Sequence, residues 1–147
     1  DLPPREALYS NLTVLASDVV EFTIEFRAFV LDRTVSAISP YVLNGELAKD
    51  LNGNWLSLPA EQRDALDFLN SMLRDTRVSL PPAVVIDVGH IKGLGWALVE
   101  FNTPPSSGLC ACDPSAALTV VSRACVPRTR ITAADAPWIL EIPRQTT

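Results

Sequence analysis

The stretch that decides the fold is residues 20–39, VEFTIEFRAFVLDRTVSAIS. From position 20 to position 30, apolar residues occupy every second place, and the places between them begin with Glu, Thr, Glu and Arg. This period of two predicts a strand with one apolar and one polar face. Asp32 and Arg33 are expected to form a tight turn, and residues 34–39 to return as the second strand of an antiparallel hairpin. Glu25 and Arg27 then share the polar face.

A second hairpin is predicted further along the chain. Residues 83–88 (AVVIDV) and 96–101 (WALVEF) are short β-rich apolar runs, and Gly93 and Gly95 lie in the connection between them. Shorter strands are expected at residues 12–15 and 138–142. Residues 44–58 are rich in Asn and Gly and are expected to be mostly loop.

Two helices are predicted between and after the hairpins. Pro59 opens the first, which is expected to run to Asp75 because proline suits the first helical position. Its apolar residues at spacings of three and four are Ala65, Leu66, Leu69, Met72 and Leu73. Asp113 and Pro114 cap and open the second helix, which is expected to turn Leu118, Val121 and Cys125 inward.

These elements place the chain in the α+β class, with a mainly antiparallel sheet and helices packed on one side of it. The 147 residues are enough for a single domain, and at 48% hydrophobic and 20% charged residues the chain can bury a core.

The charge and hydropathy exclude several partners. The formal net charge is −5, the wrong sign for a protein that binds a phosphate backbone, so no nucleic-acid partner is expected. No apolar run reaches the roughly 20 residues that span a membrane. No basic segment followed by an apolar stretch marks a secretory signal at the N-terminus. The expectation is a cytoplasmic protein with no membrane partner, and nothing in the sequence specifies its oligomeric state.

The cysteines and the single histidine give no sign of zinc or of nucleophilic catalysis. Cys110, Cys112 and Cys125 cannot all pair, and the spacing of the first two does not match the usual zinc motifs. They are interpreted as ordinary buried thiols. A catalytic triad would rest on His90 alone, and His90 is better explained as a residue at a strand end.

Three oxygen-bearing side chains carry the chemistry. In an antiparallel pairing of residues 84–88 with 96–101, Asp87 comes close to Glu100 across the hairpin, and Asn102 follows Glu100 at the same-face spacing of two. Two carboxylates and an amide oxygen are ligands of the kind that hold Mg²⁺ beside substrate phosphates. The alternative is that these are solvated side chains at strand ends. For Glu25 and Arg27 the alternative is a surface ion pair worth about 0.2–1 kcal/mol. Trp96 is interpreted as a core aromatic.

Several short motifs now appear in a recognisable order. They are residues 25–30 (EFRAFV), 39–41 (SPY), 87–89 (DVG), 95–102 (GWALVEFN), 107–109 (SGL) and 112–114 (CDP). Together they make residues 20–115 resemble the ATP-grasp superfamily, in the clade of bacterial proteins named for two arginines and a lysine. The fold that the resemblance implies is the C-terminal lobe of an ATP-grasp domain.

The resemblance implies roles for the residues that match these motifs. Asp87, Glu100 and Asn102 would be Mg²⁺ ligands. Arg27 would reach the β- and γ-phosphates of ATP, where a planar guanidinium suits pairing with oxyanions, and Asn102 would also contact the nucleotide.

Four further residues are assigned in the same way. Glu25 would orient Arg27 or contact the substrate, so that Arg27 and Glu25 form the catalytic pair. Ser106, Ser107 and Gly108 would form part of the loop that receives the acceptor substrate.

The reaction that the resemblance implies is a carboxylate–amine or carboxylate–thiol ligation. ATP phosphorylates a carboxylate, and a nucleophile attacks the acylphosphate. The partners would be the nucleotide and a small-molecule or peptide carboxylate and amine, and the cofactors ATP and Mg²⁺.

Two features depart from the family pattern. Val85 stands where many ATP-grasp enzymes have an arginine. Lys49 and Lys92 lie in expected loops, so residues 1–147 are interpreted as the C-terminal portion of the domain, with the N-terminal nucleotide lobe absent. Two alternatives stay open, a non-catalytic interaction module that keeps the fold and a metal-dependent hydrolase using Asp87 and Glu100.

Overall fold

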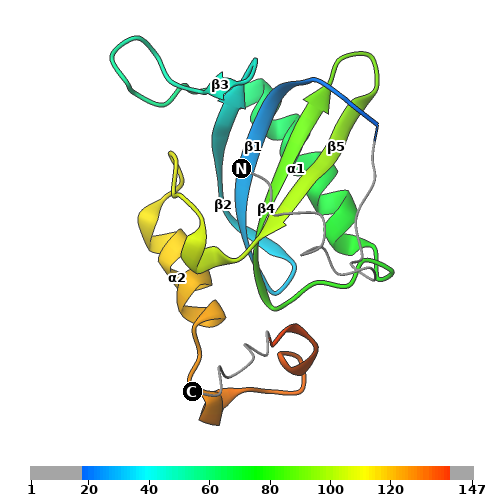
Figure 1. The fold of residues 1–147 in the computed structure, drawn as a ribbon, viewed down its shortest axis with the longest axis vertical. Coiled ribbons are helices and arrows are strands. Elements are labelled where there is room, and N and C mark those ends of the chain that lie inside the picture. The colour runs from blue at the N-terminus through cyan, green and yellow to red at the C-terminus, as the bar shows by residue number, and fades with distance from the viewer. Residues whose placement is uncertain (1–17, 140–147) are drawn as a thin grey trace, which may run out of the picture.

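The computed structural model of the chain describes residues 18–139. Its centre is a five-stranded sheet in the order β3-β2-β1-β4-β5, with every neighbouring pair antiparallel (Figure 1). The strands are β1 (Phe22–Leu31), β2 (Thr34–Leu43), β3 (Glu46–Leu47), β4 (Ala83–Ile91) and β5 (Gly95–Asn102). The helices are α1 (Pro59–Arg74) and α2 (Pro114–Ala124), and three short 3₁₀ turns are η2 (Pro104–Ser106), η3 (Arg128–Arg130) and η4 (Ala136–Trp138). The predicted α+β class and both predicted hairpins are confirmed.

The first hairpin closes as the sequence predicts and then continues further. Asp32 and Arg33 have φ angles of 45° and 62°, the left-handed pair that matches the twist of a two-residue hairpin turn. The returning strand does not stop at Ser39 but passes through Pro40 to Leu43. Proline is tolerated there because β3 pairs only with Val42 and Leu43, so β2 has no outer strand neighbour at Pro40.

The helices cover opposite faces of the sheet, so the prediction that both pack on one side is wrong (Figure 1). α1 packs against a core cluster that includes Phe26 and Ile86, and α2 packs against a second cluster that includes Phe29 and Val85. The physical reason lies in β1 and β4, whose middle residues are buried on both faces. The alternation of β1 ends at Phe29, a fully buried residue on the face that begins as polar.

The phase of α2 also differs from the prediction. Ala117 and Val120 are the residues buried against the sheet. Of the three residues expected to face inward, Val121 packs partly buried against the same cluster, whereas Leu118 is 63% exposed and Cys125 is exposed. The sequence pattern fits either stripe at a spacing of three to four, and the packing of the helix decides between them. Asp113 caps α2 as expected, by accepting a hydrogen bond from the backbone N–H of Ala116 at 2.8 Å.

The remaining expectations have mixed outcomes. Residues 44–58 are mostly loop, with β3 and an isolated bridge between Lys49 and Trp55. Trp138 lies in the 3₁₀ turn η4, not in a strand, because Pro137 has no N–H to donate to a sheet. The expected strand at residues 12–15, and residues 140–142, lie outside the described part of the chain. No helix within residues 18–139 is both long enough and apolar enough to cross a membrane.

Leu69 should contribute strongly to stability because it is fully buried between α1 and the sheet. We expect Leu69→Ala to lower the free energy of unfolding by about 2–5 kcal/mol in urea denaturation, since it removes apolar contacts and leaves a cavity. The matched control is Leu51→Ala at a fully exposed loop position, which should change stability by less than about 0.5 kcal/mol. Equal effects of the two variants would contradict this core assignment.

Candidate functional site

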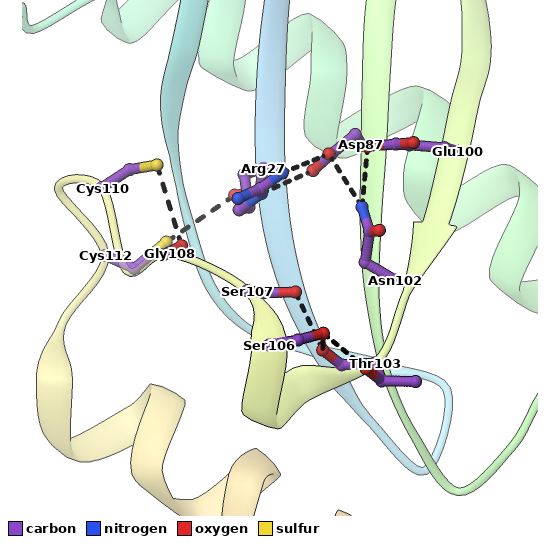
Figure 2. A network of polar contacts seen from close by, with 10 residues as sticks. All are labelled: Arg27, Asp87, Glu100, Asn102, Thr103, Ser106, Ser107, Gly108, Cys110 and Cys112. Atoms are coloured by element: carbon purple, nitrogen blue, oxygen red, sulfur yellow. Dashed lines mark hydrogen bonds and ion pairs between the residues drawn. The ribbon is translucent and has the colours of Figure 1, made fainter. Parts of the chain in front are cut away.

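The strand register places the predicted site residues in one row across the middle of the sheet. Arg27 on β1 lies opposite Asp87 on β4, and Asp87 lies opposite Glu100 on β5. Asn102 follows two residues after Glu100, and its side chain points toward the same row (Figure 2). Cross-strand neighbours on one face lie about 5 Å apart at their Cβ atoms, so the antiparallel pairing alone brings these groups together. The row lies on the face that α2 covers further along the same strands.

Arg27 and Asp87 form a buried, two-pronged ion pair. Arg27 Nε donates to Asp87 Oδ1 at 2.9 Å, and Arg27 Nη2 donates to Asp87 Oδ2 at 2.7 Å. The side chains are 9% and 1% exposed. The guanidinium also lies over the ring of Tyr41, with its Cζ 4.1 Å from the ring centroid. The alternative of a cross-strand surface ion pair is therefore wrong in its exposure: Arg27 does pair across strands, with Asp87, but the pair is buried.

Burial and hydrogen bonding act on the pKa values of this pair. The hydrogen bond from Arg27 to Asp87 raises the pKa of the guanidinium, which stays charged. Burial raises the pKa of Asp87, and the hydrogen bonds from Arg27 oppose that rise. Each charge is stabilised inside the protein by the presence of the other.

Asn102 connects Asp87 to Glu100. Its Nδ2 donates to Glu100 Oε1 at 2.8 Å and to Asp87 Oδ2 at 3.3 Å. The amide therefore stands between two carboxylates that would otherwise repel each other. With both Nδ2 contacts directed at the carboxylates, the amide oxygen of Asn102 remains as an acceptor for a ligand.

The donor set fits a Mg²⁺ ion that is shared with a phosphate ligand. Asp87, Glu100 and Asn102 supply only oxygen donors, and Mg²⁺ is usually held by one or two carboxylates together with substrate phosphates. Asp87 accepts three hydrogen bonds out of about four that a carboxylate can accept, and Glu100 is exposed. Within residues 18–139, no group of three or more His, Cys, Asp or Glu side chains is arranged to hold a metal ion. A metal at this position would depend on oxygens from the ligand.

Glu25 stands beside the row on β1, two residues before Arg27, and it is partly buried. Burial raises the pKa of Glu25 above its ordinary value, the negative charges of Asp87 and Glu100 raise it further, and the positive charge of Arg27 opposes them. The contact that orients Arg27 comes from Asp87 rather than from Glu25.

The predicted substrate loop, residues 106–108, approaches Arg27 from the side opposite Asp87 (Figure 2). The hydroxyls of Ser106 and Ser107 both donate to the backbone oxygen of Thr103, at 3.1 and 3.0 Å, and this fixes the turn around η2. A Cβ atom at Gly108 would lie 3.8 Å from Arg27 Nη1. The backbone of Gly108 therefore lies close to that edge of the guanidinium, and a side chain at this position would be in van der Waals contact with it.

Two residues of the site, Ser39 and Tyr41, have no role in the sequence-based prediction. Tyr41 stacks on Arg27, and the Ser39 hydroxyl accepts hydrogen bonds from the backbone N–H of Ala111 at 3.2 Å and from Cys112 Sγ at 3.4 Å. These contacts tie the loop before α2 to β2. The SPY motif at residues 39–41 is the signal that could have identified Tyr41 and Ser39.

The cysteines and His90 partly follow their predicted interpretations. All three thiols are free; Cys112 is buried as expected, Cys110 is half-buried and Cys125 is exposed. His90 lies near the end of β4, where its Nδ1 is 3.3 Å from the Thr23 hydroxyl and its ring packs edge-on against Trp96. Trp96 packs partly buried against the α1-side core, which agrees with its interpretation as a core aromatic. Val85, at the position of the missing arginine, is fully buried in the α2-side cluster.

The α+β fold is consistent with an ATP-grasp domain, and the comparison with known families identifies it as one. Over residues 1–120 the chain matches the model of an ATP-grasp domain family, the second family of the clade named for two arginines and a lysine, and it belongs to that family. The matched range includes the whole row of site residues and the substrate loop. No curated protein and no solved structure is similar enough to the chain to count as a match. Membership in this family supports nucleotide binding by the domain.

The burial of the ion pair leads to a prediction about stability. Arg27→Met leaves the buried Asp87 carboxylate without its partner, and we expect it to lower the free energy of unfolding by about 3–5 kcal/mol in urea denaturation. The matched control is Arg77→Met, which breaks a pair with Asp75 whose arginine is 89% exposed and should cost less than about 1 kcal/mol. The double variant Arg27→Met with Asp87→Leu should regain much of the loss, and a double variant as unstable as the sum of both single changes would contradict the explanation.

The raised pKa of Glu25 leads to a prediction about pH. Because the folded state holds this proton more tightly than the unfolded state, Glu25 should favour folding less as pH rises above about 4.3, the ordinary value for glutamate. Glu25→Gln removes this dependence. We expect its stability relative to the wild type to increase between pH 4 and pH 7, measured by urea denaturation at each pH. Glu46→Gln at an exposed position on β3 corrects for the loss of one surface charge. A constant difference between Glu25→Gln and the wild type would contradict the assignment.

Proposed function

We propose that this domain binds Mg²⁺-ATP at the row formed by Arg27, Asp87, Glu100 and Asn102, and that it takes part in an ATP-dependent carboxylate–amine or carboxylate–thiol ligation. The observation that carries the proposal is the row itself. A buried arginine, two carboxylates and an amide converge from three adjacent strands, on a face that the Ser106–Gly108 loop approaches.

Arg27 is suited to bind phosphate oxygens. Asp87 accepts from Nε and Nη2, and the remaining donors, on Nη1, face Gly108. A phosphate oxygen would have to reach Arg27 along this edge. The stacking of Tyr41 and the pair with Asp87 hold the guanidinium in one orientation, and an oriented charge stabilises a transferring phosphoryl group without reorganising.

Asp87, Glu100 and Asn102 would hold the Mg²⁺ ion. When it is bound, the ion would neutralise the negative charge of the nucleotide phosphates beside the two carboxylates. The chain's own part is to place the carboxylates and the amide in one row across the sheet and to orient Asp87 through Arg27. No nucleophilic side chain is required, because phosphoryl transfer depends mainly on positioning and electrostatics.

The substrates and the second lobe are part of the same proposal. The carboxylate to be activated would lie beside the transferred phosphate, and Ser106, Ser107 and Gly108 would contact the acceptor. Glu25 would contact a substrate amine or tune the charge of the row. Residues 1–147 would act as one domain that supplies the C-terminal part of the ATP site, and a lobe supplied from elsewhere in the full protein would cover the adenine.

Calorimetric titration of the chain with ATP, with and without Mg²⁺, tests the proposal. We expect binding that requires Mg²⁺ and weakens at least about tenfold in Glu100→Gln and in Asn102→Ala, because each change removes a metal ligand while leaving the fold intact. Glu46→Gln, an exposed carboxylate away from the row, is the control and should bind as the wild type does.

Two other outcomes would point to different functions. A folded wild-type domain that fails to bind Mg²⁺-ATP, also within its full-length protein, would favour a non-catalytic module in which Arg27 and Asp87 only stabilise the fold. Release of phosphate from simple phosphate esters without any acceptor would favour a metal-dependent hydrolase using Asp87 and Glu100. A ligase forms ADP only when a carboxylate is supplied to accept the phosphate, and it turns over steadily only when a nucleophile is supplied as well.

A further inference from the structure

A pocket of about 600 Å³ opens at the end of the sheet where β4 begins and β5 ends. Its walls come from the segment before β4, the end of β5, the C-terminal half of α2 and the segment that ends at Ile139. The lining is largely apolar, and Phe101 and Trp138 are 45% and 40% exposed there. The volume lies in the range of small-molecule sites, which are usually apolar with a few polar groups that fix orientation.

One residue belongs both to this pocket and to the row of site residues. Asn102 lines the pocket, and the same side chain donates to Asp87 and Glu100. Thr103 also lines the pocket, and it carries the backbone oxygen that holds Ser106 and Ser107 in place. The pocket therefore begins where the proposed phosphate site and the proposed substrate loop end.

The far wall of the pocket is held by an ion pair within the last described part of the chain. Arg123 Nη2 on α2 lies 2.7 Å from Asp135 Oδ1, and Asp135 Oδ2 accepts from the backbone N–H and the hydroxyl of Thr132. Arg123 and Asp135 neutralise each other, so the wall presents no net charge to a ligand. This wall lies after residue 120, beyond the range that matches the family.

We propose that this pocket binds the apolar body of the carboxylic-acid substrate, an aliphatic or aromatic monocarboxylate whose carboxylate lies at the Asn102 end. The inference rests on the proposed function, because a carboxylate that accepts phosphate from ATP has to lie beside the row. The body of the acid then extends into the pocket toward Phe101, Ala124 and Trp138. An apolar body fits because the lining offers apolar surface and a neutralised ion pair.

An NMR titration of the ¹⁵N-labelled chain with hexanoate and with acetate, in the presence of Mg²⁺ and the absence of ATP, tests this assignment. Mg²⁺ is included because the charges of Asp87 and Glu100 beside Asn102 would otherwise repel the carboxylate. We expect hexanoate to bind at least about tenfold more tightly, because each additional buried methylene strengthens binding by roughly fourfold when fully desolvated. The peaks that shift should belong to Phe101, Thr103, Ala124 and the indole of Trp138. Equal affinity for the two acids, or shifts confined to other residues, would overturn the proposal.

A pair of variants on α2 sharpens the test. Ala124→Phe places a ring in the pocket and should weaken hexanoate binding at least about tenfold, whereas Ser122→Phe, at an exposed position that does not line the pocket, should leave it unchanged. Hexanoate binding that Ala124→Phe does not weaken would overturn the proposal.

Other occupants of the pocket give different results. Hexanoate binding that appears only after Leu140→Ser and Ile142→Ser together would mean that the chain's own C-terminal residues fill the pocket. A concentration-dependent dimer that Ala124→Phe abolishes would mean that a second copy covers it. Either result would overturn the assignment to a substrate.

Different results would contradict the proposed ATP site and the proposed acid pocket. Ala124→Phe should retain Mg²⁺-dependent ATP binding in calorimetry, because Ala124 is the last residue of α2 and is not part of the row. A wild-type chain that binds ATP but not hexanoate would refute the pocket assignment alone. Hexanoate binding without any ATP binding would refute the proposed function, and the pocket would then be a monocarboxylate site without a role in ligation.

Discussion

The arrangement of the site depends on the buried ion pair between Arg27 and Asp87. A single buried charge would be strongly unfavourable, so each of these side chains requires the other. The pair joins the two central strands, β1 and β4, at a position where both faces of the sheet are covered further along. It also determines the directions of the neighbouring groups. Asn102 reaches Asp87 and Glu100 together, and Tyr41 covers the guanidinium.

The same pair explains how a stable core and a ligand site occupy adjacent positions on one face. Beyond Arg27 on β1, Phe29 packs with Val85 and Val120 under α2, and this packing supports the strands that carry the row. Toward β5 the face becomes exposed at Glu100, where a ligand has access. The loop between β5 and α2 crosses this boundary, and the contacts of Ser39 with Ala111 and Cys112 hold that loop against β2. Rigid strands thus position the charged groups, and a loop of small residues borders the space beside them.

The proposed division of labour follows from this layout. The charged row would serve the nucleotide phosphates, which are common to the whole family. The apolar pocket beyond Asn102 is built in part from residues after position 120 and would serve the acid substrate. Because Asn102 contacts both regions, a ligand bound in one region would affect the other region through this residue.

The sequence by itself determined the strands of both hairpins, the start of each helix and the residue types of the site, because period-two alternation, turn residues and caps are local properties. It also placed Asp87, Glu100 and Asn102 together, since antiparallel pairing follows from the hairpin. The tertiary structure decided which face each helix covers, since the stripe on α2 fits two phases equally well and only packing chooses Ala117 and Val120. It also decided that Arg27 pairs with Asp87 rather than standing in solvent beside Glu25. That choice joins residues 60 positions apart in the chain, and it depends on the burial that only the assembled sheet and helices create.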